Sequence, residues 1–150
     1  MRIPEPLLHA LLDRHPVARL ATRNGTSGIS QVPIVFVHHA GCLWSPVDGK
    51  AKSGRELQRL QNIRANPHVS LLLDHYEDDW SSLWWIRVDG LAEVLHADPN
   101  KDPQLATVVR MLRRKYPQYR HTPVLAGPPT LIKIQPERLV SWCSRAMDFI

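Results

Sequence analysis

LWWIRVDGLAEVL, residues 83–95, alternates along its length in the manner of a long β-strand. Every second residue is apolar or small, and this face consists of Trp84, Ile86, Val88, Gly90, Ala92 and Val94. The other face mixes apolar side chains with the charged residues Arg87, Asp89 and Glu93. A strand of this kind lies with one face on a core and the other towards the surface. Gly90 marks the point where we expect a bend or a β-bulge.

Further strands are expected at residues 17–23, 29–38, 42–46, 69–74, 130–134 and 139–143. The dipeptides Asn24–Gly25 and Ala40–Gly41 predict tight turns between the first three of them. Pro33 favours an edge or a bulge for the second strand, because proline donates no ladder hydrogen bond. The strand at 69–74 has little polar interruption, which predicts that both of its faces are covered.

Three helices are expected, at residues 4–14, 54–65 and 103–116. Ser53 and Glu56 form a capping-box pattern at the second helix, and Asp102 is placed to cap the third. The strands come in runs joined by tight turns, with the helices between the runs. This order favours an antiparallel β-barrel with peripheral helices over a doubly wound sheet. We therefore predict one mainly β domain spanning residues 1–150.

Composition and charge exclude several classes of protein. The 150 residues carry 19 Lys and Arg against 14 Asp and Glu, and 43% of them are apolar, which excludes a disordered chain. The longest apolar run falls far short of the ~20 residues of a transmembrane helix, so we expect no membrane partner. Two cysteines, Cys42 and Cys143, cannot form a disulfide framework. The N-terminus lacks the apolar core of a signal peptide, and we expect a cytoplasmic protein with reduced thiols.

The basic charges are not gathered in one block. Residues 103–136 contain no acid and a second basic stretch runs from Lys50 to Arg64, whereas residues 74–79 are acidic. Basic and acidic residues mixed in this way are typical of solvated surface. A specific anion-binding site is the alternative interpretation. A basic nucleic-acid binder is a third hypothesis, but no nucleic-acid motif is present, so we expect no nucleic-acid partner.

Common catalytic and metal-binding motifs are missing from the sequence. There is no dinucleotide fingerprint, no phosphate-binding P-loop and no nucleophile elbow. Ser81 or Ser82 beside His75 could mimic a nucleophile and its base, but nothing fixes a third partner. The run from Asp74 to Asp79 is an acidic surface loop in the simpler interpretation and a metal site in the other. We therefore predict no metal and nominate no catalytic residue.

Two lysines indicate an anion site. Lys50 and Lys52 lie between a strand end and the capped helix, and their spacing on an extended segment places them on the same side. A helix N-terminus with two ammonium groups binds phosphate well, although a solvated basic loop is the alternative interpretation. Arg19 lies inside the first strand, where a half-buried guanidinium needs an anionic partner. That partner is either a ligand or a protein carboxylate such as Asp74 or Asp89.

Three tryptophans, Trp80, Trp84 and Trp85, cluster with Arg87 around the start of the long strand. Tryptophans on a strand indicate a core or a subunit interface, or else a wall for a flat ligand. Tryptophans can contribute both to a subunit interface and to a wall for a flat ligand where a cofactor site lies between two subunits.

In this order, the patterns resemble the pyridoxamine 5'-phosphate oxidase-like split-barrel superfamily, and most of all its small branch of flavin- or deazaflavin-dependent oxidoreductases. The resemblance covers roughly residues 10–143. It is carried by VARLAT (17–22), VPIVF (32–36), DGKAK (48–52), NIRANPHVSLL (62–72), DHYEDDW (74–80) and LWWIRVDG (83–90). Each run alone is a weak signal, and their combination in this order is specific.

The resemblance implies a six-stranded antiparallel split β-barrel that forms a homodimer. It also implies a cofactor in a cleft between the two subunits, either flavin mononucleotide (FMN) or the deazaflavin coenzyme F420. The residues that would contact it are Arg19, Leu20, Ala21 and Thr22 on the first strand, Val32, Pro33 and Ile34 along the ring, Lys50 and Lys52 at the phosphate, and Trp84 and Arg87 from the other subunit. Trp142 lies near a position where related proteins place an aromatic side chain beside the ring.

The function that the resemblance implies is an oxidoreductase that transfers hydride to or from a small-molecule substrate, with the cofactor supplying the redox chemistry. A flavin- or haem-binding protein without turnover is the alternative, because fold does not fix function. Pyridoxamine 5'-phosphate oxidase activity is a further alternative. True pyridoxamine phosphate oxidases carry a longer, Arg-rich C-terminal part where this sequence ends at Ile150, which argues against that activity.

Overall fold

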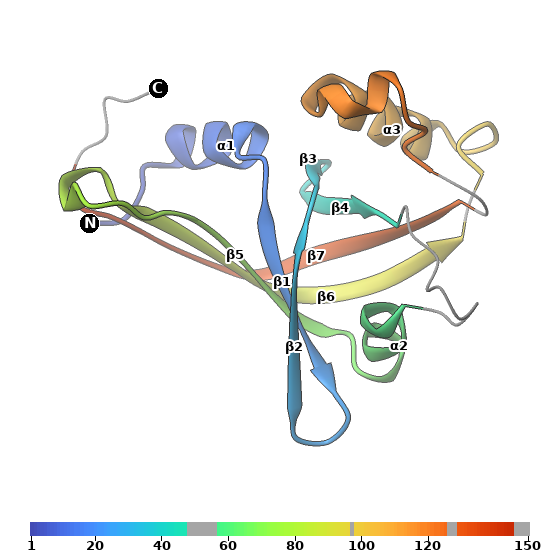
Figure 1. The fold of residues 1–150 in the computed structure, drawn as a ribbon, viewed down its shortest axis with the longest axis horizontal. Helices are drawn as coiled ribbons and strands as arrows, with labels where there is room; N and C mark the ends of the chain where they lie inside the picture. Colours follow the sequence, from blue (N-terminus) through green and yellow to red (C-terminus); the bar gives the residue numbers. More distant parts are fainter. Residues whose placement is uncertain (48–56, 97, 126–128, 146–150) are drawn as a thin grey trace.

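One antiparallel sheet with helices around it forms the described part of the chain (Figure 1). The computed structural model describes residues 1–47, 57–96, 98–125 and 129–145. Its helices are α1 (Glu5–Arg14), α2 (Gln58–Ala65) and α3 (Pro103–Lys115), with the short 3-10 turns η1 (Trp80–Ser82) and η2 (Pro117–Arg120). Its strands are β1 (Ala18–Asn24), β2 (Gly28–Ile34), β3 (Val37–His39), β4 (Cys42–Pro46), β5 (His68–His75), β6 (Trp84–His96) and β7 (Thr130–Cys143).

The order of the strands curls the sheet into a split barrel. Within the described residues the order is β2-β1-β5-β6-β7-β4-β3, and neighbouring strands are antiparallel. The two edge strands, β2 and β3, follow each other in the chain, with only Val35 and Phe36 between them (Figure 1). Three peptide units span at most about 11 Å, so the two edges of the sheet must approach each other. β2 and β3 are thus halves of one bent strand, which reconciles the seven observed strands with the six expected.

The antiparallel pairing of β6 with β7 is the longest of the sheet, with strands of 13 and 14 residues. The predicted irregularity at Gly90 is confirmed, because the register shifts at this residue. A Cβ atom at Gly90 would lie 2.4 Å from the carbonyl oxygen of Gln135, so a larger residue requires a backbone shift. The two strands predicted at residues 130–134 and 139–143 are one strand, since Pro136 pairs with Gly90 at the bulge and does not end β7.

Strand β5 differs from the prediction that both faces of residues 69–74 are covered. Val69, Leu71 and Leu73 are buried, whereas Leu72 between them is 38% exposed. One face of this central strand therefore lies on the core, and the other is open in the protomer instead of being covered. Pro33 is where it was expected, because β2 pairs with β1 alone and forms an edge of the sheet.

The inner face of the sheet and the helices α1 and α2 enclose the main core. Trp84, Ile86 and Val88 of β6 are buried in it, which confirms the apolar face of the sequence pattern. A second cluster packs α3 against β3 and β4 and includes Val37, Trp44, Leu105, Val108 and Leu112. The described residues thus form two hydrophobic clusters, one on the inner face of the sheet and one beneath α3.

The helix ends test the capping predictions. The Asp102 carboxylate accepts hydrogen bonds from two first-turn backbone N–H groups of α3 at 2.9 and 3.4 Å, which confirms the predicted cap. The helix predicted at residues 54–65 is described from Gln58, and its capping box of Ser53 and Glu56 lies outside the described residues. No helix in the described stretches has the length and apolar character needed to cross a membrane.

Candidate functional site

Strand alternation divides the predicted site residues between the two faces of the sheet. The core face takes Leu20, Thr22, Ile34 and Trp84, which are buried, and the half-buried Val32, which packs against the same core. The opposite face, called here the outer face, takes Arg19, Ala21, Pro33 and Arg87. Lys50 and Lys52 lie outside the described residues, so their contact with a phosphate stays a prediction.

Trp84 is a core residue of its own protomer. It is 4% exposed, and its ring meets the ring of His15 edge to face with 5.0 Å between centroids. Burial lowers the pKa of His15, and the nearby Asp74 carboxylate opposes that shift. Residues three apart on a strand lie on opposite faces, so Trp84 does not point outward with Arg87. The tryptophan that shares the outer face with Arg87 is Trp85, and a role for Trp84 at a ligand has no support in its position.

The pairing register arranges the outer face in rows that cross the strands. The central row is Pro33, Arg19, Leu72, Arg87 and Val140, from β2, β1, β5, β6 and β7 in that order. The row on one side of it is Gln31, Ala21, Ser70, Asp89 and Arg138. The row on the other side contains Asp74, Trp85 and Trp142. The outer face therefore combines apolar and aromatic side chains with regularly spaced charges.

Both arginines of the central row are oriented by carboxylates of the same face. Arg19 Nη1 donates to Asp74 Oδ1 over 2.8 Å, which confirms the protein-carboxylate alternative for its partner. Arg87 Nε lies 3.3 Å from Oδ2 of Asp89, whose Oδ1 accepts from the Ser70 hydroxyl at 2.8 Å. The Arg19 and Arg87 side chains are 52% and 41% exposed, so these pairs orient the guanidinium groups more than they stabilise the fold. Each guanidinium has five N–H donors and keeps several for an external anion.

A groove of about 280 Å³ is hollowed into the outer face beside the β6–β7 bulge. Its walls include Ala21, Ser70 and Asp89 from the second row, with Arg23 and Ile29 near the β1–β2 turn. The groove therefore lies along the row of Ala21, Ser70 and Asp89 and extends towards the β1–β2 turn.

Four residues of this face, Trp85, Leu72, Ser70 and Asp89, are not among the cofactor contacts that the resemblance implies. The alternation that defines the core face of LWWIRVDG also predicts that Trp85 lies on the opposite face with Arg87, because the two residues are two positions apart on the strand. Leu72, Ser70 and Asp89 join the site through the pairing of β5 with β1 and β6. That pairing links segments about 50 residues apart along β1 and β5, and no local pattern specifies its register.

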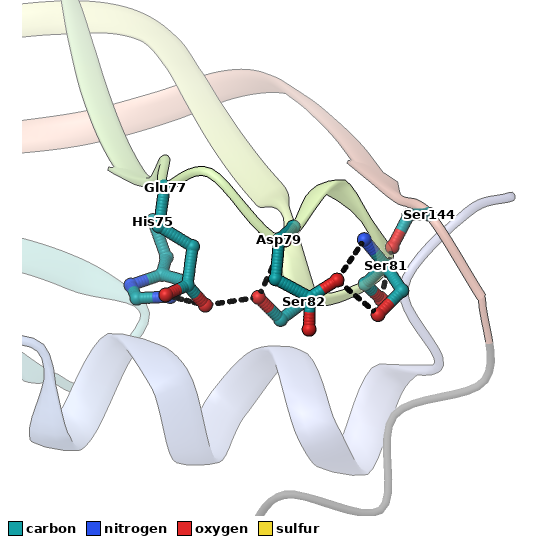
Figure 2. Close-up of polar contacts among 6 residues, drawn as sticks. All are labelled: His75, Glu77, Asp79, Ser81, Ser82 and Ser144. Carbon is teal, nitrogen blue, oxygen red and sulfur yellow. Dashed lines mark hydrogen bonds and ion pairs between the residues drawn. The ribbon is translucent and has the colours of Figure 1, made fainter.

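The acidic loop between β5 and β6 is a hydrogen-bonded turn (Figure 2). Glu77 accepts hydrogen bonds from His75 Nε2, at 2.9 Å, and from the Ser82 hydroxyl. Asp79 accepts from the backbone N–H of Ser81 at 3.0 Å and from the Ser81 hydroxyl at 2.6 Å. Hydrogen bonds from Ser82 and then His75 lower the pKa of Glu77, and the Ser81 hydroxyl lowers the pKa of Asp79. Both hydroxyls donate to carboxylates and neither donates to His75, so these residues form no nucleophile–base pair.

The described residues hold no competing centre of a common kind. No three His, Cys, Asp or Glu side chains among them are placed to bind one metal ion. Cys42 and Cys143 are buried free thiols, which an external substrate does not reach. The outer face, with its oriented arginines, aromatic side chains and groove, is therefore the candidate site.

The strand order and the bent β2–β3 strand define the class of protein, a split β-barrel of the flavin-binding type. The sequence model of the pyridoxamine 5'-phosphate oxidase family matches residues 5–143, and the chain belongs to that family. The resemblance stated from the sequence is thereby confirmed. No curated protein matches the chain.

Several solved structures share the fold. A conserved hypothetical protein from Mycobacterium tuberculosis is similar with a TM-score of 0.74 and 19% identity, over 95% of this chain and 86% of its own. An FAD-binding protein from Mesorhizobium loti is similar with a TM-score of 0.68 and 18% identity, over 94% and 93% of the two chains. The haem storage protein HutZ from Vibrio cholerae is similar with a TM-score of 0.70 and 17% identity, over 93% and 94%. At these identities the likeness establishes the fold alone.

Proposed function

We propose that the outer face binds a flavin, either FMN or the deazaflavin F420, and that the protein is an oxidoreductase. It transfers hydride between this cofactor and a small-molecule substrate. The observation that carries the proposal is the central row, where two oriented arginines alternate with the apolar side chains of Pro33, Leu72 and Val140. Membership of the pyridoxamine 5'-phosphate oxidase family supports it, as does the FAD-binding protein among the similar structures.

The residues of the outer face suit such a cofactor. A flavin or deazaflavin ring is flat and largely apolar, and Leu72, Trp85 and Trp142 offer it an apolar and aromatic surface. Leu72 is 38% exposed and Trp142 is 37% exposed, so both have area left to bury against a ligand. Arg19 and Arg87 keep N–H donors for the polar edge of the ring or for a phosphate.

The side chains of this face bind and orient. A bound flavin supplies the hydride donor and acceptor. Arg87 is held by Asp89 and presents its guanidinium to the face, where it would stabilise negative charge on the ligand. Lys50 and Lys52, which lie outside the described residues, complete the proposal as the phosphate ligands.

We further propose that two copies of the chain share the site. A ligand on the outer face of one protomer would be covered on one side only. This face also carries Ile29, Leu72, Leu91 and Trp142, which are 73%, 38%, 36% and 37% exposed. Exposed apolar residues gathered on one face are typical of an interaction surface, and a stable dimer buries about 800 Å² per partner. A second copy would bury these side chains and supply the missing wall.

Cofactor binding and dimerisation are both measurable on the full chain. Purified protein is titrated with FMN and, separately, with F420, and the cofactor fluorescence is followed. Light scattering gives the mass of the complex. The proposal expects saturable binding of one of the two cofactors, with one molecule per protomer of a dimer. Colourless protein that binds neither cofactor overturns it.

A second candidate is a flavin- or haem-binding protein without turnover. The similarity to a haem storage protein over nearly the whole of both chains supports it. Oxidation of a reduced nicotinamide or a reduced deazaflavin by the loaded protein supports the oxidoreductase, whereas tight binding without turnover, or a haem absorbance band, supports the second candidate. Pyridoxamine 5'-phosphate oxidase activity is tested by supplying that substrate and measuring the aldehyde product.

A further inference from the structure

A second cavity lies away from the outer face, between α1, β3 and α3. Its volume is about 520 Å³. Figure 1 shows α1 and α3 on the two sides of β3, at the end of the molecule opposite the β1–β2 turn. Three cationic side chains line the cavity, Arg14, Arg114 and Lys115, against one carboxylate, that of Asp13. The cavity therefore has a net positive lining.

Lys115 is a fixed cation in the cavity wall. Its ammonium group donates to the carbonyl oxygens of Phe36 and Leu12 at 3.0 and 3.4 Å, and it lies 3.7 Å from the centroid of the Phe36 ring. Both acceptors are neutral, so they hold the ammonium group without neutralising it. Burial lowers the pKa of Lys115 to about 8, opposed by the charge of Asp13, and the group is still charged at pH 7. A half-buried positive charge in this setting is stabilised by an anion.

Tyr116, next to Lys115, makes the wall rigid. Its hydroxyl accepts a hydrogen bond from the Phe36 N–H at 2.9 Å and lies 2.8 Å from the Pro16 carbonyl oxygen, to which it donates. α3 is thus tied to the β2–β3 link and to the segment that follows α1. A positive wall held in this way is preorganised, which reduces the ordering cost of binding a ligand.

Arg14 and Arg114 stand in the last turns of α1 and α3. The positive charges of Arg14 and Arg114 at these positions interact favourably with the negative ends of the helix dipoles. Within the described ranges, neither guanidinium forms an ion pair with a carboxylate. Asp13, the one acid of the lining, instead lies 3.8 Å from Nδ1 of His38. The donors of both arginines therefore remain available to a ligand.

We propose that this cavity binds a small organic anion, either a carboxylate or a phosphate monoester with a short apolar part. Arg14 and Arg114 would hold the charged group, and Lys115 adds positive potential from the wall. The remaining lining includes the apolar side chains of Val37 and Met111, which would contact the apolar part of the ligand. The site shares no residue with the outer face, so the proposal of an anion site does not depend on the proposal that the outer face binds a flavin.

The test is a set of nuclear magnetic resonance titrations of the ¹⁵N-labelled full chain with phenyl phosphate, benzoate and neutral benzyl alcohol. We expect saturable shifts of the Val37 and Met111 amide signals with one or both anions and none with benzyl alcohol. The tighter of the two anions distinguishes the phosphate class from the carboxylate class. Absence of saturable shifts with both anions overturns the proposal, as does equal binding of benzyl alcohol.

Paired variants separate this site from general attraction to a basic surface. Arg14→Gln with Arg114→Gln should weaken anion binding at least tenfold, which corresponds to about 1.4 kcal/mol. The control, Arg110→Gln with Arg113→Gln, removes the same charge from side chains that do not line this cavity. Its affinity should fall by less than that of the first double variant, because these side chains neighbour Arg114 on α3 but do not line the cavity. An equal loss in both double variants contradicts a built site.

Discussion

Replacing Gly90 with alanine tests whether the close approach of β7 requires a glycine at the β6–β7 bulge. A Cβ atom there would lie 2.4 Å from the carbonyl oxygen of Gln135, 3.1 Å from its carbonyl carbon and 3.2 Å from Cα of Pro136. All three are backbone atoms of β7, so relief requires moving the paired strand. Overpacking of this kind typically costs up to about 3 kcal/mol, and we expect the free energy of unfolding to fall by about 2–3 kcal/mol. For a domain of this size, the melting temperature should fall by roughly 4–12 °C.

The assay is thermal and urea unfolding followed by far-ultraviolet circular dichroism, with Gly25→Ala as the matched control. Gly25 has a φ of +70° and no atom within 4 Å of an added Cβ, so its substitution costs only backbone strain, about 1–2 kcal/mol. A loss at Gly90→Ala below about 0.5 kcal/mol, the usual range for an inconsequential surface change, would refute the steric reasoning. A loss smaller than that of the Gly25 control would do the same.

Substitutions at three further positions test a buried hydrogen-bonded hydroxyl, a helix cap and the proposed dimer interface. Tyr116→Phe removes the hydroxyl bonded to Phe36 and Pro16, and denaturant titration at pH 7 should show a loss of about 1–3 kcal/mol. Burial raises the pKa of Tyr116 from 10.0 to about 12, so the unfolded state loses the phenol proton first and the free energy of unfolding of the wild type falls from pH 10 to pH 12. Tyr116→Phe should lack this fall. A pH profile of stability that is the same in both proteins would contradict the raised pKa of Tyr116. Asp102→Ala should cost about 1 kcal/mol in the same titration, with Asp102→Asn close to the wild type. Leu72→Asp should give a monomer by light scattering with an unchanged circular dichroism spectrum, and a persistent dimer contradicts the proposed interface.

Local patterns in the sequence predict most of the elements because their causes are local. The alternation from Trp84 onward follows from the period of a strand, and the Asp102 cap follows from the free N–H groups of a helix start. The bulge at Gly90 follows from a glycine inside a strand pattern. These features require no knowledge of the partner strand.

The outer face could not be predicted in the same way because it depends on register. Leu72 lies beside Arg19 and Arg87 only through the pairing of β5 with β1 and β6. An apolar run such as residues 69–74 has the same sequence pattern in two cases: when its second face is covered by the same chain, and when that face is open to a partner. The alternation along β6 separates Trp84, which is buried in the core of the protomer, from Arg87 on the outer face.

The most direct test of the proposed function is the affinity of the full chain for FMN and F420, measured by cofactor fluorescence on the wild type, Arg87→Gln and Arg110→Gln. We predict saturable binding of one cofactor by the wild type. We expect at least tenfold weaker binding by Arg87→Gln, since a charged hydrogen bond contributes about 1.5–3 kcal/mol, and unchanged binding by Arg110→Gln. Wild-type protein that binds neither cofactor, or equal affinity in all three proteins, would contradict the placement of the site on the outer face.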